Sequence, residues 1–254
     1  MIKAENLSFS YSDKKIINNL FAEFHTGELC SVIGENGSGK TTLIKLLSRF
    51  LTPNNGTIFV DAKTSSSYSQ KEYAKLVSVL PQQRPTPFIS VYDLVSHGRF
   101  AYLGFSRRLS KLDIEKIDEA LIITDTMRFA DKNIKNLSGG ERQRAYIAML
   151  LAQDTKYLLL DEPVAHLDIY HSFEIMELLK KLSASGKGII TVMHDLTSAL
   201  KYSDKLLLID KETPILFDSP DALIASKQLE KTFKIHCNCV EFMGKNEYFF
   251  TPIH

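Results

Sequence analysis

The amino-acid sequence predicts an α/β protein with a mostly parallel sheet, an antiparallel N-terminal β region and an inserted helical subdomain. Short apolar runs typical of buried strands recur along the chain. In the C-terminal half they alternate with helical patterns, which is the order of a parallel sheet with crossover helices. Between the two halves, residues 90–130 have the apolar spacing of helices.

Composition indicates one large globular unit. The 254 residues suit one α/β domain, or one domain with a sizeable insertion, and 44% of them are hydrophobic. Lys and Arg number 31 and Asp and Glu 30, so we expect no nucleic-acid partner. Three cysteines favour free thiols in a reducing compartment. We expect no membrane span and no signal peptide, because the apolar runs are too short and residues 1–6 are too polar.

The N-terminal third is predicted to be rich in strands. A helix is predicted over residues 42–50, and Tyr11 is expected in a loop. The sequence Pro-Asn-Asn-Gly at 53–56 predicts a turn, and the serine-rich stretch 65–69 predicts a surface loop. The predicted strands cover residues 2–9, 16–24, 28–33, 57–61 and 75–80.

The stretch after Pro81 predicts a helical insertion. A proline-rich loop leaves the sheet there, and two serines then begin helices. Ser90 with Asp93, and Ser110 with Asp113, have the spacing of capping boxes, with Asp in place of the usual Glu or Gln. The predicted boundaries are 1–82 and 153–254 for the core and 83–152 for the helical subdomain.

The C-terminal half alternates between helices and strands. Ser219 is expected to cap a short helix whose first residue is Pro220. The predicted helices cover residues 141–152 and 170–182, and the predicted strands cover 156–160, 188–193 and 205–209.

Residues 34–42, Gly-Glu-Asn-Gly-Ser-Gly-Lys-Thr-Thr, fit the phosphate-binding pattern G-x-x-x-x-G-K-[ST]. The glycines let successive N–H groups surround phosphate oxygens, and the following helix directs its positive dipole end at them. Lys40 is expected to reach the terminal phosphates of ATP, and Thr41 to bind Mg²⁺. A turn that only joins strand to helix is the alternative, which the apolar flanks disfavour. The sequence therefore predicts a P-loop NTPase core whose phosphate contacts come from Gly34, Asn36, Gly37, Ser38, Gly39, Lys40, Thr41 and Thr42.

Asp161 and Glu162 end a predicted buried strand. Ligands of parallel sheets bind outside the carboxyl ends of strands, where the phosphate loop also lies. Asp161 is therefore expected to hold Mg²⁺ through water, and Glu162 to orient or deprotonate the attacking water. A solvated acidic pair is the alternative interpretation.

A second anion-binding helix start follows at Leu137-Ser138-Gly139-Gly140-Glu141. A chain with one phosphate loop should not need two such starts. The simplest explanation is that Ser138, Gly139 and Gly140 contact a nucleotide that a second copy of the chain holds.

With these motifs in this order, the chain resembles the ATP-binding subunit of an ATP-binding cassette (ABC) transporter. Leu137 to Glu141 match the signature motif of that family. The stretches 166–169 (His-Leu-Asp-Ile) and 97–100 (His-Gly-Arg-Phe), with His171, are similar to the subgroup that imports iron-siderophore, haem or cobalamin chelates. Val164, Ala165 and His166 depart from the residues that the family commonly has there.

The resemblance implies further roles. Tyr11 would stack on adenine, and Asp168 would link the two active sites of a dimer. Gln82 would sense the γ-phosphate and contact Mg²⁺, with Gln83 as the competing candidate. His194 would contact the γ-phosphate. A core or surface tyrosine is the alternative for Tyr11, and a lone histidine is otherwise more often structural than catalytic.

The implied partners are a second copy of the chain, integral membrane permease subunits and, indirectly, a substrate-binding protein. The resemblance places the chain on the cytoplasmic face of the membrane, with the helical subdomain as docking surface. A soluble single-cassette assembly factor of the iron–sulfur type is the alternative. A phosphate-loop kinase does not explain Leu137 to Glu141.

The run His236-Cys237-Asn238-Cys239 raises the possibility of a metal site. Its spacing is not C-x₂₋₄-C and no second pair exists, so we expect Cys237 and Cys239 to be small buried residues instead. Cys30 is expected in the core.

Overall fold

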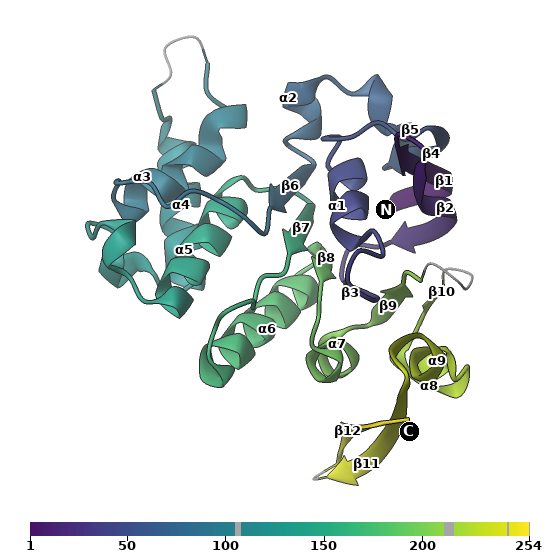
Figure 1. Ribbon diagram of the computed structural model, residues 1–254. Helices are drawn as coiled ribbons and strands as arrows, with labels where there is room; N and C mark the ends of the chain where they lie inside the picture. Colours follow the sequence, from purple (N-terminus) through teal and green to yellow (C-terminus); the bar gives the residue numbers. More distant parts are fainter. Residues whose placement is uncertain (105–107, 211–215, 243, 254) are drawn as a thin grey trace.

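The computed structural model describes residues 1–104, 108–210, 216–242 and 244–253 (Figure 1). Within these residues, the central sheet has six strands in the order β10-β9-β3-β8-β7-β6. Strands β9, β3, β8, β7 and β6 run parallel, and β10 pairs antiparallel with β9 at one edge. This sheet confirms the predicted α/β class. Its strands are β3 (Leu29–Ile33), β6 (Val77–Leu80), β7 (Tyr157–Asp161), β8 (Gly188–Val192), β9 (Lys205–Leu208) and β10 (Leu216–Asp218).

The central sheet separates two apolar cores. Successive side chains of a strand point to opposite faces. On β7, Leu158 and Leu160 therefore join a core shared with the helices, while Tyr157 and Leu159 join a core beneath the N-terminal sheet. Burial on both faces is typical of a parallel sheet covered on each side.

The N-terminal β region is an antiparallel sheet in the order β2-β1-β4-β5. Helix α1 (Lys40–Leu47) buries its leucines in the core between this sheet and the central one. The expected loop position of Tyr11 is wrong, because Tyr11 pairs with Lys14 as the last residue of β1. The strands are β1 (Ile2–Tyr11), β2 (Lys14–Phe24), β4 (Asn55–Val60) and β5 (Lys63–Thr64).

The predicted helices after Pro81 stand together beside the β6 edge of the sheet (Figure 1). Ser90 caps the first through Asp93, and Ser110 forms the predicted capping box with Asp113. A serine-rich stretch that was expected to be a loop instead leads, through a 3₁₀ turn and Ser69, into the short helix α2 (Gln70–Tyr73). The helices of the group are α3 (Val91–Ser96), a 3₁₀ turn at His97–Ala101, α4 (Lys111–Ile123) and α5 (Gly139–Ala152).

The His-Gly-Arg-Phe stretch has a structural role in this helical group. Arg99 is 2% exposed, donates through Nε to Asp113 Oδ1 at 2.8 Å and through Nη1 to Ala152 O at 2.8 Å. A Cβ on Gly98 would lie 2.3 Å from Met149 O, so the turn packs directly on α5. The stretch therefore joins α4 to the C-terminal end of α5.

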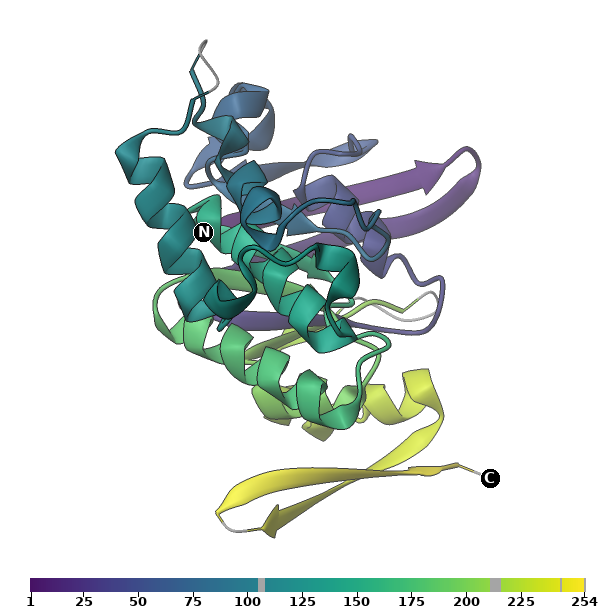
Figure 2. The ribbon, with the colours of Figure 1, turned by 90° about the vertical axis from the view of Figure 1, so that its left-hand side faces the viewer.

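Near its end the chain forms the predicted short helix that Ser219 caps and Pro220 begins. A second short helix and a hairpin follow, and neither was predicted from the sequence. The hairpin extends as a twisted ribbon at the bottom of Figure 2. Its strand β12 packs against α7, and β11 packs against α9. The remaining elements are α6 (Ile169–Ala184), α7 (Leu196–Tyr202), α8 (Pro220–Ala225), α9 (Gln228–Phe233), β11 (Ile235–Phe242) and β12 (Lys245–Pro252).

Two of the three cysteines, Cys237 and Cys239, lie on strand β11 of this hairpin. Cys239 is exposed and Cys237 is half-buried, so the expectation that both are buried is wrong, whereas Cys30 is in the core as predicted. Strand alternation directs His236 and Asn238 to the face opposite the two thiols. Among the described residues, no cluster of three His, Cys, Asp or Glu side chains could hold a metal ion. None of the described helices is long and apolar enough to cross a bilayer.

Candidate nucleotide-binding site

The phosphate loop runs from the end of β3 to the start of α1, as predicted. Gly34 has a φ of 150°, and a Cβ there would lie 2.1 Å from Ile209 O, so this position accepts only glycine. Lys40 is 6% exposed, and its Nζ donates to the carbonyl oxygens of Gly34 at 2.8 Å and Glu35 at 2.9 Å. The ammonium group therefore lies over the concavity of the loop.

A cleft of about 310 Å³ opens beside this loop. Its walls include Asn36, Gly37, Gly39, Lys40, Thr41 and Thr42 from the loop and Glu162 and His194 from other strands. Lys14 and Ile16 complete the wall, and the sequence analysis missed both. A Cβ on Gly39 would lie 2.8 Å from Ile16 Cγ2, so β2 packs closely on the loop. Tyr11, the predicted adenine contact, is 45% exposed and lies edge-on to Phe9, at the hairpin that leads to Lys14.

Thr41 and Asp161 meet at the base of the cleft. Thr41 Oγ1 donates to Asp161 Oδ1 at 3.3 Å, and Asp161 is 3% exposed. Burial raises the pKa of Asp161, the Thr41 hydrogen bond lowers it, and the Glu162 charge raises it again, for a net increase. Burial also lowers the pKa of Lys40, against the opposing effect of both carboxylates. The base of the cleft is therefore poorly solvated and holds charges of both signs.

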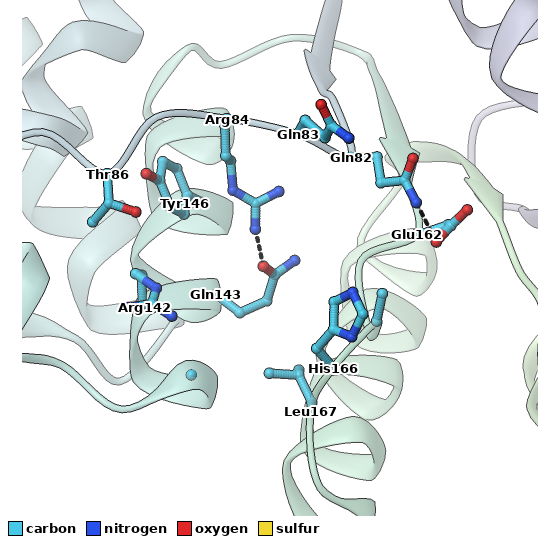
Figure 3. A pocket seen from close by; sticks show the side chains of 12 residues that line it. Gln82, Gln83, Arg84, Thr86, Arg142, Gln143, Tyr146, Glu162, His166 and Leu167 are labelled. Atoms are coloured by element: carbon cyan, nitrogen blue, oxygen red, sulfur yellow. Dashed lines mark hydrogen bonds between the residues drawn. The ribbon is translucent and has the colours of Figure 1, made fainter.

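Glu162 is held between two of the other predicted catalytic residues. Gln82 Nε2 donates to Glu162 Oε2 at 2.7 Å (Figure 3), and His194 Nε2 lies 2.6 Å from Glu162 Oε1. Glu162 has a φ of 54°, in the left-handed region, directly after the last residue of β7. The structure thus brings Gln82 and His194 to the Glu162 carboxylate, whereas Gln83 lines a neighbouring cleft.

The second predicted anion site lies at the start of α5. Ser138 caps α5 by accepting from Glu141 N, and Glu141 Oε2 accepts from Ser138 N at 2.9 Å. The Ser138 backbone N–H, with a smaller effect of the Ser138 hydroxyl, holds the pKa of the Glu141 carboxyl group below its usual value. Ser138, Gly139 and Gly140 are not among the described residues that line the phosphate-loop cleft. Within one chain, the structure does not bring the two glycine-rich sites together.

Asp168 caps α6 and contacts the second site through a histidine. His171 N donates to Asp168 Oδ1 at 2.9 Å, and His171 Nδ1 lies 2.8 Å from Asp168 Oδ2. The imidazole packs against Gly140, where a Cβ would lie 2.0 Å from His171 Cδ2. One turn further along both helices, Arg144 Nη1 pairs with Glu174 Oε2 at 2.7 Å. These contacts fix Asp168 relative to the start of α5.

Comparison with known proteins identifies the family. The family described as ABC transporter matches this chain over residues 17–165, which is more than half of it. The chain belongs to the ABC transporter family of ATP-binding proteins. As an ABC subunit, it binds ATP and hydrolyses it to drive transport.

Relatives and solved structures of ABC subunits match nearly the whole chain. The petrobactin import ATP-binding protein FpuC of Bacillus anthracis is 38% identical, over 99% of this chain and 93% of that protein. The ferric enterobactin transport ATP-binding protein FepC of Escherichia coli (strain K12) is 34% identical, over 94% and 89%. The dimeric structure of MJ0796, a bacterial ABC transporter cassette, matches with a TM-score of 0.71 and 27% identity, over 82% of this chain and 94% of that one.

The ABC subunit also contains a network near Gln82 that the sequence analysis missed. Arg84 donates through Nη2 to Gln143 Oε1 and through Nη1 to Pro81 O at 3.0 Å, and its guanidinium lies 4.3 Å above the ring of Tyr146. Tyr146 in turn donates to Pro85 O at 2.8 Å. The sequence shows that Arg84 is charged and lies two residues after Gln82, but no local pattern indicates its partners on α5.

Proposed function

We propose that this ABC subunit powers the import of an iron chelate, as two copies that enclose two ATP molecules. The named relatives support the cargo class, because one imports petrobactin and another transports ferric enterobactin. The observation that carries the catalytic part is the meeting of Gln82 and His194 at the Glu162 carboxylate, in a cleft that also contains Lys40.

Two features support a two-copy site. The backbone N–H groups at the start of α5 can bind an anion. This helix start lies outside the described lining of the phosphate-loop cleft of its own chain. A related cassette has been solved as a dimer. We therefore assign each nucleotide to Lys40 of one copy and to Ser138 and Gly140 of the other, with Asp168 between the two sites and Tyr11 on the adenine.

The residues at the base of the cleft fit Mg²⁺. Thr41 and Asp161 present oxygen atoms 3.3 Å apart, and hard oxygen ligands suit this cation. Gln82 donates through its nitrogen to Glu162, so its amide oxygen remains for the ion. When bound with ATP, Mg²⁺ neutralises phosphate charge.

Phosphoryl transfer depends mainly on positioning and charge stabilisation. Lys40 places its ammonium beside the terminal phosphates, and the loop amides hold the remaining oxygens. Glu162 accepts hydrogen bonds on both carboxylate oxygens, so its orientation is fixed where it can align a water and take its proton. His194 lies on the side of Glu162 that faces the phosphate loop and would contact the γ-phosphate.

The work must reach separate membrane subunits. We assign residues 1–82 and 153–254 to the ATPase core and 83–152 to a helical subdomain that docks on permease subunits at the cytoplasmic face of the membrane. A substrate-binding protein would then deliver cargo to the permease. Arg84 and Tyr146 support this division, because they connect the Gln82 loop to α5 of the helical group.

The decisive test is Glu162→Gln. The variant should bind ATP normally and lose hydrolysis by at least about 10²-fold, the effect of removing one transition-state group. Glu115→Gln, on the exposed face of α4, is the matched control and should hydrolyse at the wild-type rate. Wild-type turnover in Glu162→Gln would contradict the assigned role.

The two-copy site has its own test. Ser138→Arg should bind ATP on each chain and fail to dimerise on it, measured by light scattering in the Glu162→Gln background. Co-purification with a polytopic membrane protein, and ATPase stimulation by a ferric chelate in the reconstituted complex, test the transport assignment. An ABC subunit that co-purifies only with soluble partners would contradict it.

A further inference from the structure

We infer that a second cleft, beside the catalytic one, binds a phosphate-class oxyanion. This Arg84 cleft has a volume of about 410 Å³. It lies between the Gln82 loop, which follows β6, the start of α5, and the His166 loop, which joins β7 to α6 (Figure 3). Its lining includes Arg84, Arg142, Gln143, His166 and Glu162.

Two arginines face the Arg84 cleft without a counter-ion. Arg84 is half-buried, and Arg142 lines the same cleft. Among the described residues, neither Arg84 nor Arg142 has a carboxylate partner within 4.0 Å, although Arg144 on the same helix pairs with Glu174. Two adjacent guanidinium groups repel each other unless an anion lies near them. The cleft therefore has an excess of positive charge.

A buried amide adds a directed donor. Gln143 is 5% exposed, and its Nε2 has no hydrogen-bond partner in the described part of the chain. Arginine has donors only, so the Gln143 atom that faces Arg84 must be the oxygen, and the nitrogen must face away from it. Figure 3 shows the amide between Arg84 and the His166 loop, with the nitrogen on the side of that loop. An oxyanion in the cleft would accept from this nitrogen.

The remaining lining does not cancel this charge. Among the described residues that line the cleft, Glu162 is the one carboxylate and Arg84 and Arg142 are two guanidinium groups, so positive charge exceeds negative charge by one. Gly139, in the first turn of the fourteen-residue helix α5, also lines the cleft, so the positive end of the helix dipole favours an anion there. Guanidinium groups, an amide N–H and a helix start together match the acceptors of phosphate.

Glu162 lines both the Arg84 cleft and the phosphate-loop cleft. In the proposed function, hydrolysis releases phosphate next to Glu162, so the Arg84 cleft is the adjoining site for that product. This step rests on the proposed function, whereas binding of the ion does not. Free phosphate from the cell is the other source of the same ligand.

Phosphate binding can be measured without nucleotide. The full chain with Lys40→Ala, which removes the phosphate-loop ammonium, is titrated with inorganic phosphate by calorimetry. We expect one ion per chain and an affinity that falls by about tenfold or more in Arg142→Gln, the effect of one charge-assisted hydrogen bond. Arg128→Gln, which removes an exposed arginine paired with Asp125, is the matched control and should leave the affinity unchanged. A Lys40→Ala chain that binds no phosphate, or an Arg142→Gln affinity equal to that of the control, overturns the inference.

A second variant distinguishes the loss of a phosphate contact from a loss of folding. Gln143→Leu removes the amide at similar volume, and it should also weaken phosphate binding while thermal denaturation shows a folded chain. Unchanged binding in this folded variant would remove the amide from the site and overturn the inference.

The source of the ion is tested by the kinetics of phosphate release. If the product occupies the cleft, Arg142→Gln in the otherwise wild-type chain releases phosphate severalfold faster in a single turnover. Weaker binding with an unchanged release rate identifies free phosphate as the ligand and still supports the site. The titration does not depend on ATP hydrolysis, so its failure is distinct from a failure of the Glu162→Gln test.

Discussion

The imidazole of His171 packs against the backbone of Gly140, so the helix that begins at the Asp168 cap and the helix that begins at Ser138 are in direct contact. A Cβ on Gly140 would lie 2.0 Å from His171 Cδ2, which is too close for two carbon atoms that are not bonded to each other. The imidazole ring would therefore have to move. Because His171 also binds the Asp168 carboxylate, any shift of the ring moves two predicted parts of the dimer site together.

Gly140→Ala should therefore destabilise the chain by about 1–3 kcal/mol, the typical effect of overpacking. Urea denaturation measures this. Gly104→Ala is the control, because no atom of the residues that the structure describes lies within 4 Å of a Cβ there. In the double variant Gly140→Ala/His171→Ala the clash is absent, so the two effects should not add. Additive effects would show that the ring does not limit this position.

The buried pair of Arg99 and Asp113 predicts a large effect on stability. Arg99→Met should lower the free energy of unfolding by about 3–5 kcal/mol at neutral pH, because Asp113 keeps its charge without its partner. Arg128→Met removes an exposed pair and should cost about 1 kcal/mol or less. Equal effects of the two substitutions would contradict the prediction.

The same pair predicts a dependence on acid. Burial raises the pKa of Asp113, but hydrogen bonds from Ser110 and Arg99 outweigh it and hold the pKa below the ordinary 3.8. A carboxyl with a lowered folded-state pKa stabilises the fold above its unfolded pKa, and this contribution is lost as pH falls through the folded value. Denaturation between pH 5 and about pH 2 should therefore show a smaller acid-dependent loss in Arg99→Met than in the wild type.

Local patterns predicted the elements whose signals lie within a few residues. The phosphate loop, the Ser110 cap and the apolar β7 strand each carry such a signal, and each was found in place. The hairpin β11–β12 was missed because β11 is mostly exposed on both faces, so its sequence has no apolar alternation. Contacts such as Arg84 with Gln143 depend on how a loop docks on α5, and spacing along the chain does not encode that.

The same limit applies to the catalytic candidates, whose approximate positions the sequence predicts but whose contacts it does not. Gln82, Glu162 and His194 each follow a strand of the parallel sheet, so strand order alone predicts that they share an edge. Glu162 has a left-handed backbone and accepts from both neighbours, and its residue type indicates neither feature. The sequence could therefore predict the neighbourhood of these residues and not their hydrogen bonds.

The three cysteines should differ in reactivity. The thiolate is the reactive form, and burial raises the pKa of the Cys30 thiol far above its usual range and also raises that of Cys237. With a disulfide reagent, we expect Cys239 to react first, Cys237 more slowly and Cys30 only after denaturation. The variant Cys239→Ser should lose the fast phase. Three equal rates in the native chain would contradict the burial pattern.

Thr41 and Asp161 give a prediction for metal dependence. Thr41→Val removes the hydroxyl that donates to Asp161, so the already raised pKa of Asp161 should rise further. The Mg²⁺ concentration for half-maximal ATPase activity should then increase by about tenfold or more, as expected for one lost charge-assisted contact. The acid limb of the pH–rate profile should move to higher pH, because Asp161 must lose its proton before it can hold the ion. Thr41→Ser keeps the hydroxyl and should retain both wild-type values. An unchanged Mg²⁺ requirement in Thr41→Val would place the metal elsewhere.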